Sequence, residues 1–272
     1  MKLRLFSSII LFALTSPAFA SHLTIQSAPV IAPGKLYVGA FGGGGSSNNF
    51  DASQFGTAFF PEAAGGALSV NAFGQLNKQS TSFFGVQLGY QAPAIILDPC
   101  WTLGPAAELE AYTMNRRSFN GSLHNETPRL DEHDFAVSYP MRSAVFLANA
   151  VLSYNHSRLF VRPYIGFGIG NALVKISGAN ATQVNPPENV NHYNSSPSDT
   201  QSTFAGQIKL GLSYDINKYV NFFAEYRSLY LASTHFVFGS TVLPTHAPTS
   251  SWQVKLDHQR YNLGNIGVRF NW

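Results

Sequence analysis

Seven charged side chains stand at alternate positions within otherwise apolar or glycine-rich segments. They are Glu108, Glu110, Arg162, Lys209, Glu225, Arg227 and Arg269. Leaving a buried charge without a partner costs several kcal/mol, so charges on an inward face must pair. We therefore expect an ion-pair and hydrogen-bond network inside the fold, joined by Tyr164 and Gln87. Its simplest role is to fill the interior and fix the strand register.

Two further groups of residues have the composition of a reactive site. Ser233 and His235 are two residues apart, so on a strand they share one face, as a nucleophile and its base would. No third group is placed to orient the histidine. The other candidate histidines are His124, His133 and His246. We expect no catalytic residue.

The run Asp131-Glu132-His133-Asp134 has the residue types of a divalent-cation site. Adjacent hydrated loop charges need no ligand, and a solvated loop is the favoured interpretation. We therefore expect no metal-binding or cofactor-binding residues and no cofactor. Cys100 is the single cysteine, so an internal disulfide is excluded.

The composition excludes two classes of protein. Charged residues make up 11% of the chain and hydrophobic residues 45%, which is too apolar for a disordered chain. The net charge is only +3 and basic residues do not cluster, so no nucleic-acid partner is expected.

The first 20 residues have the pattern of a signal peptide. Lys2 and Arg4 precede a short apolar run, and Ala18-Phe19-Ala20 matches a cleavage site. We predict export, with a signal peptide at 1–20, a periplasmic segment at 21–34 and a folded domain at 35–272. No later segment has the 18 continuous apolar residues of a membrane-spanning helix.

Eight later segments alternate between apolar and polar or glycine residues. They are Lys35–Gly44, Ser82–Tyr90, Trp101–Met114, Arg142–Tyr154, Leu159–Val174, Phe204–Tyr214, Tyr219–Leu231 and Tyr261–Trp272. A period of two over about 10 residues is typical of strands that cross an outer membrane. A secreted sandwich also alternates, but its polar face would be rich in Lys, Glu, Thr and Ser. The fold class is therefore all-β, a transmembrane antiparallel up-and-down β-barrel.

The connections between these segments alternate between long and short. Long extracellular loops and short periplasmic turns are typical of bacterial outer-membrane barrels, with both termini in the periplasm. The long loops are expected at 45–81, 115–141, 175–203 and 232–260. Eight strands are predicted, or ten if the first loop contains a hairpin at Ala58 to Leu76.

The segments KLYVGAFGG, RPYIGFGIG, VNFFAEYRSLY and LGNIGVRFNW resemble the eight-stranded outer-membrane barrels of the OmpA and opacity-protein type. The resemblance implies a bacterial outer-membrane location, with contacts to membrane lipid and lipopolysaccharide. It also implies that the outer-membrane insertion machinery reads a C-terminal signal formed by Ile266, Val268, Phe270 and Trp272. Aromatic residues near strand ends are expected to form an interfacial girdle: Tyr37, Tyr90, Trp101, Tyr154, Tyr214, Tyr219, Phe270 and Trp272.

The expected function is that of a non-enzymatic surface protein, which supports envelope integrity or contacts a host or environmental ligand through its four loops. The resemblance also suggests an alternative in which the interior charges act as a gate and the barrel is a narrow pore for small solutes. An outer-membrane hydrolase is a third alternative.

Overall fold

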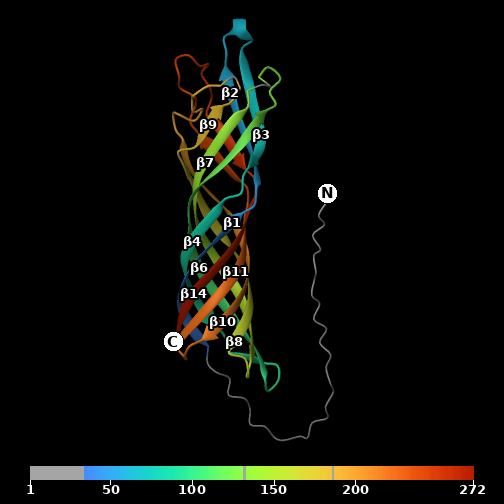
Figure 1. Cartoon of the computed structure of the whole chain (residues 1–272), viewed down its shortest axis with the longest axis vertical. Coiled ribbons are helices and arrows are strands. Elements are labelled where there is room, and N and C mark those ends of the chain that lie inside the picture. Colours follow the sequence, from blue (N-terminus) through green and yellow to red (C-terminus); the bar gives the residue numbers. More distant parts are fainter. Residues whose placement is uncertain (1–33, 131–132, 186) are drawn as a thin grey trace, which may run out of the picture. The chain divides into compact units, whose positions relative to one another are not determined.

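The computed structural model describes residues 34–130, 133–185 and 187–272 (Figure 1). The predicted signal peptide and nearly all of the segment 21–34 lie outside the described residues. Within the described part of the chain, no helix is long and apolar enough to cross a membrane.

Eight long strands form a closed antiparallel ring. They are β1 (Lys35–Ser47), β4 (Ser80–Gln91), β6 (Trp101–Asn125), β7 (Phe135–His156), β8 (Val161–Ser177), β10 (Ser198–Asp215), β11 (Val220–Leu231) and β14 (Gln259–Asn271). Each strand pairs with the next in this order. The ring closes where β14 pairs with β1. Each of the eight predicted segments corresponds to one ring strand, so the predicted fold is confirmed.

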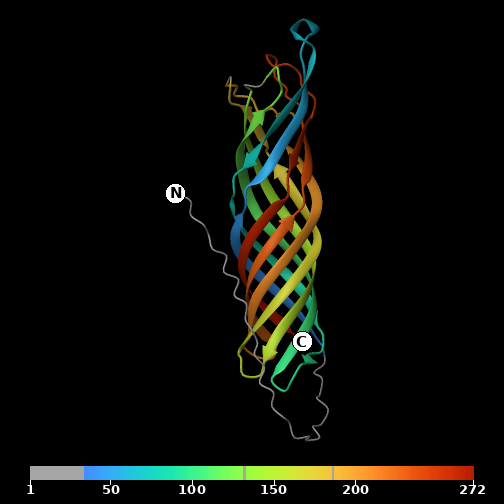
Figure 2. The ribbon, with the colours of Figure 1, turned by 90° about the vertical axis from the view of Figure 1, so that its right-hand side faces the viewer.

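The remaining strands lie at the end of the barrel opposite the C-terminus, apart from the short β5 (Ile95–Ile96). They are β2 (Phe50–Phe59), β3 (Ala67–Leu76), β9 (Asn180–Gln183), β12 (Thr234–Phe238) and β13 (Trp252–Leu256). We call this end the loop end and the other the turn end. The β2–β3 hairpin, joined through the 3-10 turn η1 (Glu62–Ala64), projects from the loop end (Figures 1 and 2).

The hairpin does not enlarge the ring. Strand β3 pairs with β6 only between Ala72–Leu76 and Gly121–Asn125, above the level at which β4 pairs with β6. The first loop therefore contains the hairpin that the ten-strand alternative required, but the barrel has eight strands. At the loop end, β13 pairs with β2, and β12 pairs with β13.

The side-chain pattern of the ring strands reverses along their length. In the lower part of β8, which is the part nearer the turn end, Phe167 and Ile169 point outward and are exposed. In its upper part, Val174 and Ile176 point inward and are buried, whereas the neighbouring Lys175 is exposed. The lower part is suited to lipid outside the barrel, and the upper part to water outside and an apolar core inside.

Because of this reversal, two of the predicted loops were drawn too long. Strand β6 continues to Asn125 and β7 begins at Phe135, within the predicted loop 115–141. Strand β10 begins at Ser198, within the predicted loop 175–203. The polar positions that indicated loops are the outward faces of strands that extend beyond the apolar surface.

Large apolar side chains surround the lower barrel and are exposed. They include Leu36, Val38, Phe84, Val86, Leu88, Leu109, Phe146, Phe167, Ile169, Ile208, Leu210, Leu212, Phe222, Ile266 and Phe270. A continuous apolar surface of this kind is a membrane-contacting surface. We call it the apolar belt. It makes the chain a membrane-spanning barrel of the outer-membrane type.

Most of the predicted girdle residues are exposed near the turn end, including Tyr90, Tyr154, Tyr214 and Trp272. Tyr37 is an exception, and its prediction was wrong. Its side chain is buried because Leu36 and Val38 on either side take the outward positions.

Candidate functional site

Six of the seven predicted charged residues meet at one level of the barrel interior. They are Glu108, Glu110, Lys209, Glu225, Arg227 and Arg269. We call them the lumen network. They project from β6, β10, β11 and β14. Alternate side chains of each strand face the interior, and all six residues stand at these inward positions.

The cations of the lumen network each contact two or more acids. Lys209 Nζ lies 2.8 Å from Glu110 Oε1 and also contacts Glu108. Arg227 Nη1 lies 3.0 Å from Glu110 Oε2, and its Nε donates to Glu225 Oε2 at 2.9 Å. Three acids and three bases cancel in charge, so the network contains no excess charge.

Hydroxyl donors from β1 and β8 and an amide donor from β10 complete the network. The Tyr37 hydroxyl donates to Glu108 at 2.5 Å, and the Tyr164 hydroxyl donates to Glu225 at 2.6 Å. Gln207 Nε2 donates to Glu110 Oε2 at 2.7 Å. Arg269 Nη2 lies 3.3 Å from Glu108 Oε1 and 3.4 Å from Glu225 Oε1.

The network closes the interior at this level. The side chains of Lys209, Arg227 and all three glutamates are 0% exposed. The guanidinium of Arg227 also lies 4.2 Å from the ring centroid of Phe41, which packs beside it. An eight-stranded barrel is just wide enough to be filled by side chains, and here the filling is polar and its charged groups are paired.

Glycines on the facing strands provide the space for these long side chains. A Cβ on Gly166 would lie 2.7 Å from Lys209 Cε. A Cβ on Gly211 would collide with the ring of Tyr164, and one on Gly89 with the ring of Tyr37. The inward glycines of the strand pattern therefore have a packing role.

Two residues predicted to join the network do not take part in it. Arg162 points inward, but it lies at the mouth of the turn end, where its partly exposed side chain pairs with Asp215. Alternation gives the face of a residue but not its depth in the barrel. Gln87 is buried at the predicted face, yet within the described residues its side-chain amide has no hydrogen-bond partner.

Three of the predicted C-terminal signal residues lie on the outer face of β14, and Trp272 directly follows that strand. Ile266, Phe270 and Trp272 are exposed, and Val268 is partly exposed. They form part of the apolar belt at the turn end, and their recognition by insertion machinery stays a prediction.

The serine–histidine pair and the acidic run, which had the composition of a reactive site, do not form one in the described residues. His235 is exposed on β12, opposite Lys255 in the strand register, and no hydrogen bond joins it to Ser233 in the described part of the chain. Asp131 and Glu132 of the acidic run lie outside the described residues. Asp134 accepts a hydrogen bond from the backbone N–H of Asn125 at 3.0 Å, and this bond is the main cause that holds its pKa below the usual 3.8.

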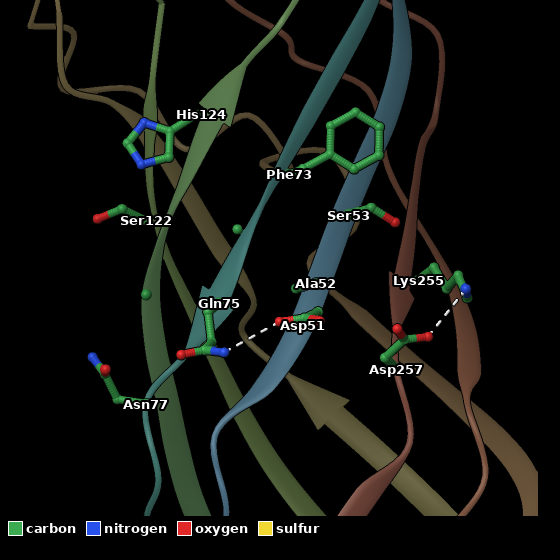
Figure 3. Close-up of a pocket in the computed structure, with 12 residues that line it drawn as sticks. Asp51, Ala52, Ser53, Phe73, Gln75, Asn77, Ser122, His124, Lys255 and Asp257 are labelled. Atoms are coloured by element: carbon green, nitrogen blue, oxygen red, sulfur yellow. Dashed lines mark hydrogen bonds and ion pairs between the residues drawn. The ribbon is translucent and has the colours of Figure 1, made fainter.

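A broad open groove runs along the outer surface of the loop end (Figure 3). Strand β2 contributes Asp51 and β3 contributes Gln75, which donates to Asp51 at 3.3 Å. Lys255 and Asp257 form an ion pair of 3.1 Å at the opposite side. The groove has a volume of about 860 Å³ and is lined by acidic and basic side chains and by the ring of Phe73.

Four exposed basic residues lie where the apolar belt ends. Arg142 pairs in register with Lys175, two residues above the exposed Leu173. Arg117 pairs with Met141, and Arg116 donates to the carbonyl oxygen of Ser177 at 2.8 Å. We call Arg116, Arg117, Arg142 and Lys175 the basic belt. Its members come from three strands, so no pattern in the sequence brings them together.

Comparison with protein families gives one match. A family described as "Surface antigen" matches residues 140–272, which span the second half of the barrel from β7 to β14. The match confirms the resemblance to small outer-membrane surface barrels for this part of the chain. No curated protein matches the sequence.

Solved outer-membrane barrels are similar at low identity. The Escherichia coli outer membrane protease OmpT has 11% identity and a TM-score of 0.39, over 92% of this chain and 99% of that chain. Neisserial surface protein A has 15% identity and a TM-score of 0.34, over 87% and 97%. The attachment invasion locus protein Ail of Yersinia pestis has 12% identity and a TM-score of 0.32, over 89% and 100%. Likenesses this distant say nothing about function.

Proposed function

Starting from a membrane-spanning barrel whose residues 140–272 match a surface antigen family, we propose that the chain is a non-enzymatic surface protein of the bacterial outer membrane. In this proposal the loop end faces the exterior and contacts host or environmental ligands. The closed lumen carries the proposal, because the side chains of Lys209 and Arg227 are completely excluded from solvent. A barrel filled in this way can present a surface but offers no path for solutes.

The loop end supports this role because it is built largely of paired strands. Strands β2, β3, β12 and β13 continue the sheet beyond the apolar belt, and Leu76, Val254 and Trp252 from these strands belong to the apolar core of the barrel. The groove of Figure 3 lies on the outside of this structured region. Ordered strands hold a contact surface in one shape, which is what specific ligand binding requires.

The outward orientation of the loop end can be tested with cysteine labelling. Cys100 is exposed near the turn end and the chain has no other cysteine. In intact cells, a membrane-impermeant maleimide should leave Cys100 unlabelled. It should label Glu62→Cys, on the hairpin turn, in a Cys100→Ser background. Labelling of Cys100 but not of the introduced cysteine would reject the proposed orientation.

We further propose that the basic belt binds lipopolysaccharide phosphates and so supports envelope integrity. Exposed guanidinium and ammonium groups directly above an apolar surface match a lipid whose phosphates lie above its acyl chains. The test is the amount of lipopolysaccharide that co-purifies with the protein. Replacing Arg116, Arg117, Arg142 and Lys175 by Ala should remove most of it.

The matched control changes Arg158 and Lys218, which lie in turns at the turn end, to Ala. This control should retain the lipopolysaccharide. Equal amounts bound to both variants and to the unchanged protein would reject the lipopolysaccharide contact while leaving the surface role open.

A further inference from the structure

Three side chains with metal-binding atoms meet inside the loop end. They are Glu188 and His192, which follow β9, and His246, from the connection between β12 and β13. One ligand atom from each residue lies within 4.8 Å of the other two, and His246 Nε2 is 3.7 Å from Glu188 Oε2. We call these residues the histidine cluster. The lumen network is a separate set of side chains, at the level of the apolar belt.

Both histidines are held in the tautomer that a metal ion needs. His192 Nδ1 lies 2.9 Å from the carbonyl oxygen of Ala181, and His246 Nδ1 lies 2.6 Å from that of Ala247. A carbonyl oxygen can only accept, so each Nδ1 carries the hydrogen and each Nε2 keeps its lone pair when the ring is neutral. Donation of the second ring nitrogen to a backbone carbonyl is the usual support for a metal-binding histidine.

The surroundings favour neutral imidazole and leave an acceptor unused. His192 is buried, with Phe135 and Trp252 in edge-on contact at centroid distances of 5.1 Å and 5.9 Å. Within the described residues, Glu188 Oε2 is buried and accepts no hydrogen bond.

A cavity of about 190 Å³ adjoins the cluster, lined by its three residues together with Phe60, His133 and Trp252. Three protein ligands beside a cavity leave room for a water molecule as the fourth ligand, which is the arrangement of an open zinc site.

We propose that Glu188, His192 and His246 bind a divalent transition-metal ion, best matched by Zn²⁺. Two imidazole nitrogens and one carboxylate oxygen are borderline ligands that zinc prefers, whereas Ca²⁺ takes about six to eight oxygens. Ligand bonds of about 2.0–2.2 Å require the three atoms to move closer together. Glu188 and His246 lie in connections between strands, where small side-chain movements bring this about. The bound ion links His192 and His246, which lie 54 residues apart in the sequence.

The proposal does not depend on the proposed surface function, and it is tested by metal binding alone. Protein without a histidine tag, purified and treated with chelator, is titrated with ZnCl₂ in a calorimeter. We expect saturation at a single ion per chain. His246→Ala and Glu188→Ala should each weaken binding by about 10- to 100-fold or more, since even loss of an outer-shell partner costs that much.

The control is a chain carrying His124→Ala and His235→Ala, two exposed histidines outside the cluster, which should bind Zn²⁺ as the unchanged protein does. Heat-modifiable migration on gels verifies that each variant is folded. Substitution with Co²⁺ should give the intense visible absorption of a four-coordinate site. Absence of saturable binding, or binding that is unaffected by His246→Ala and Glu188→Ala, would overturn the proposal.

Discussion

The lumen network and the histidine cluster both bring polar side chains together inside the fold, but they are satisfied in different ways. The side chains of Lys209, Arg227 and the three glutamates are fully buried, whereas in the cluster only His192 is buried, and Glu188 and His246 are partly exposed. In the lumen network, every carboxylate faces cations, two of the three also accept from a tyrosine hydroxyl, and the charges cancel. In the histidine cluster, one ligand atom from each of two histidines and one carboxylate oxygen converge beside a cavity. A satisfied buried network stabilises one structure, whereas convergent unused acceptors indicate a bound cation.

The largest expected effect is from breaking the lumen network. Lys209→Ala leaves Glu108 and Glu110 buried without their shared cation, and we expect a loss of about 3–5 kcal/mol in the free energy of unfolding. Urea unfolding in lipid vesicles measures this loss. Arg162→Ala is the matched control, since its partly exposed pair with Asp215 contributes about 0–1 kcal/mol. Equal losses in the two variants would mean that burial does not distinguish the two ion pairs.

A smaller effect is expected from filling the space beside the network. Gly166→Ala places a methyl group against the Lys209 stem, which must shift away from its acids. Overpacking of this kind costs about 1–3 kcal/mol. Gly42→Ala is a suitable comparison, because its added Cβ would have no contact shorter than 3.6 Å. The same unfolding measurement should show little change for Gly42→Ala, and an equal loss would reject the packing role of Gly166.

At the loop end, the polar core is expected to respond locally. The Tyr193 hydroxyl donates to Gln54 Oε1 at 2.6 Å and lies 2.9 Å from the Tyr139 hydroxyl. Tyr193→Phe removes these bonds at a cost of about 1 kcal/mol. Hydrogen exchange should speed up in β2 and β9 while the strands at the apolar belt stay protected. Faster exchange throughout the barrel would show that the two regions are coupled.

The smallest effect concerns the exposed loop after β6. Because the pKa of Asp134 is lowered in the folded chain, its contribution to stability is present above the unfolded value and is lost as the pH falls below about 3.8. Amide exchange at Asn125, whose N–H donates to Asp134, should increase in that range. Asp134→Asn should remove the pH dependence, and a dependence that persists in this variant would assign it to another group.

The fold could be predicted because lipid enforces strict alternation. Phe167 and Ile169 alternate with glycines, and only a membrane-crossing strand explains that pattern over eight segments. The upper parts of β6, β7 and β10 were missed because the pattern reverses there, and outward residues such as Arg142 and Lys175 resemble a loop. The face of the charged residues was also predictable, but the depth of Arg162 depends on strand tilt and register.

The histidine cluster could not be predicted from the sequence. His192 and His246 belong to different loops, and no spacing rule connects them with Glu188. The acidic run Asp131-Glu132-His133-Asp134 gave a stronger local signal, yet only the cavity shows that His133 lies near the cluster. Metal sites built from separate connections become visible only when the strands that position them are known.

Conductance shows whether the ion-pair network closes the lumen. The purified barrel is inserted into a planar bilayer, and its folding is verified by heat-modifiable migration. We predict no stable channel openings, because Lys209, Arg227 and the three glutamates leave no solvent-exposed side-chain surface at their level. Stable openings in the unchanged protein, with a conductance that rises with salt, would contradict the account and make the network a gate.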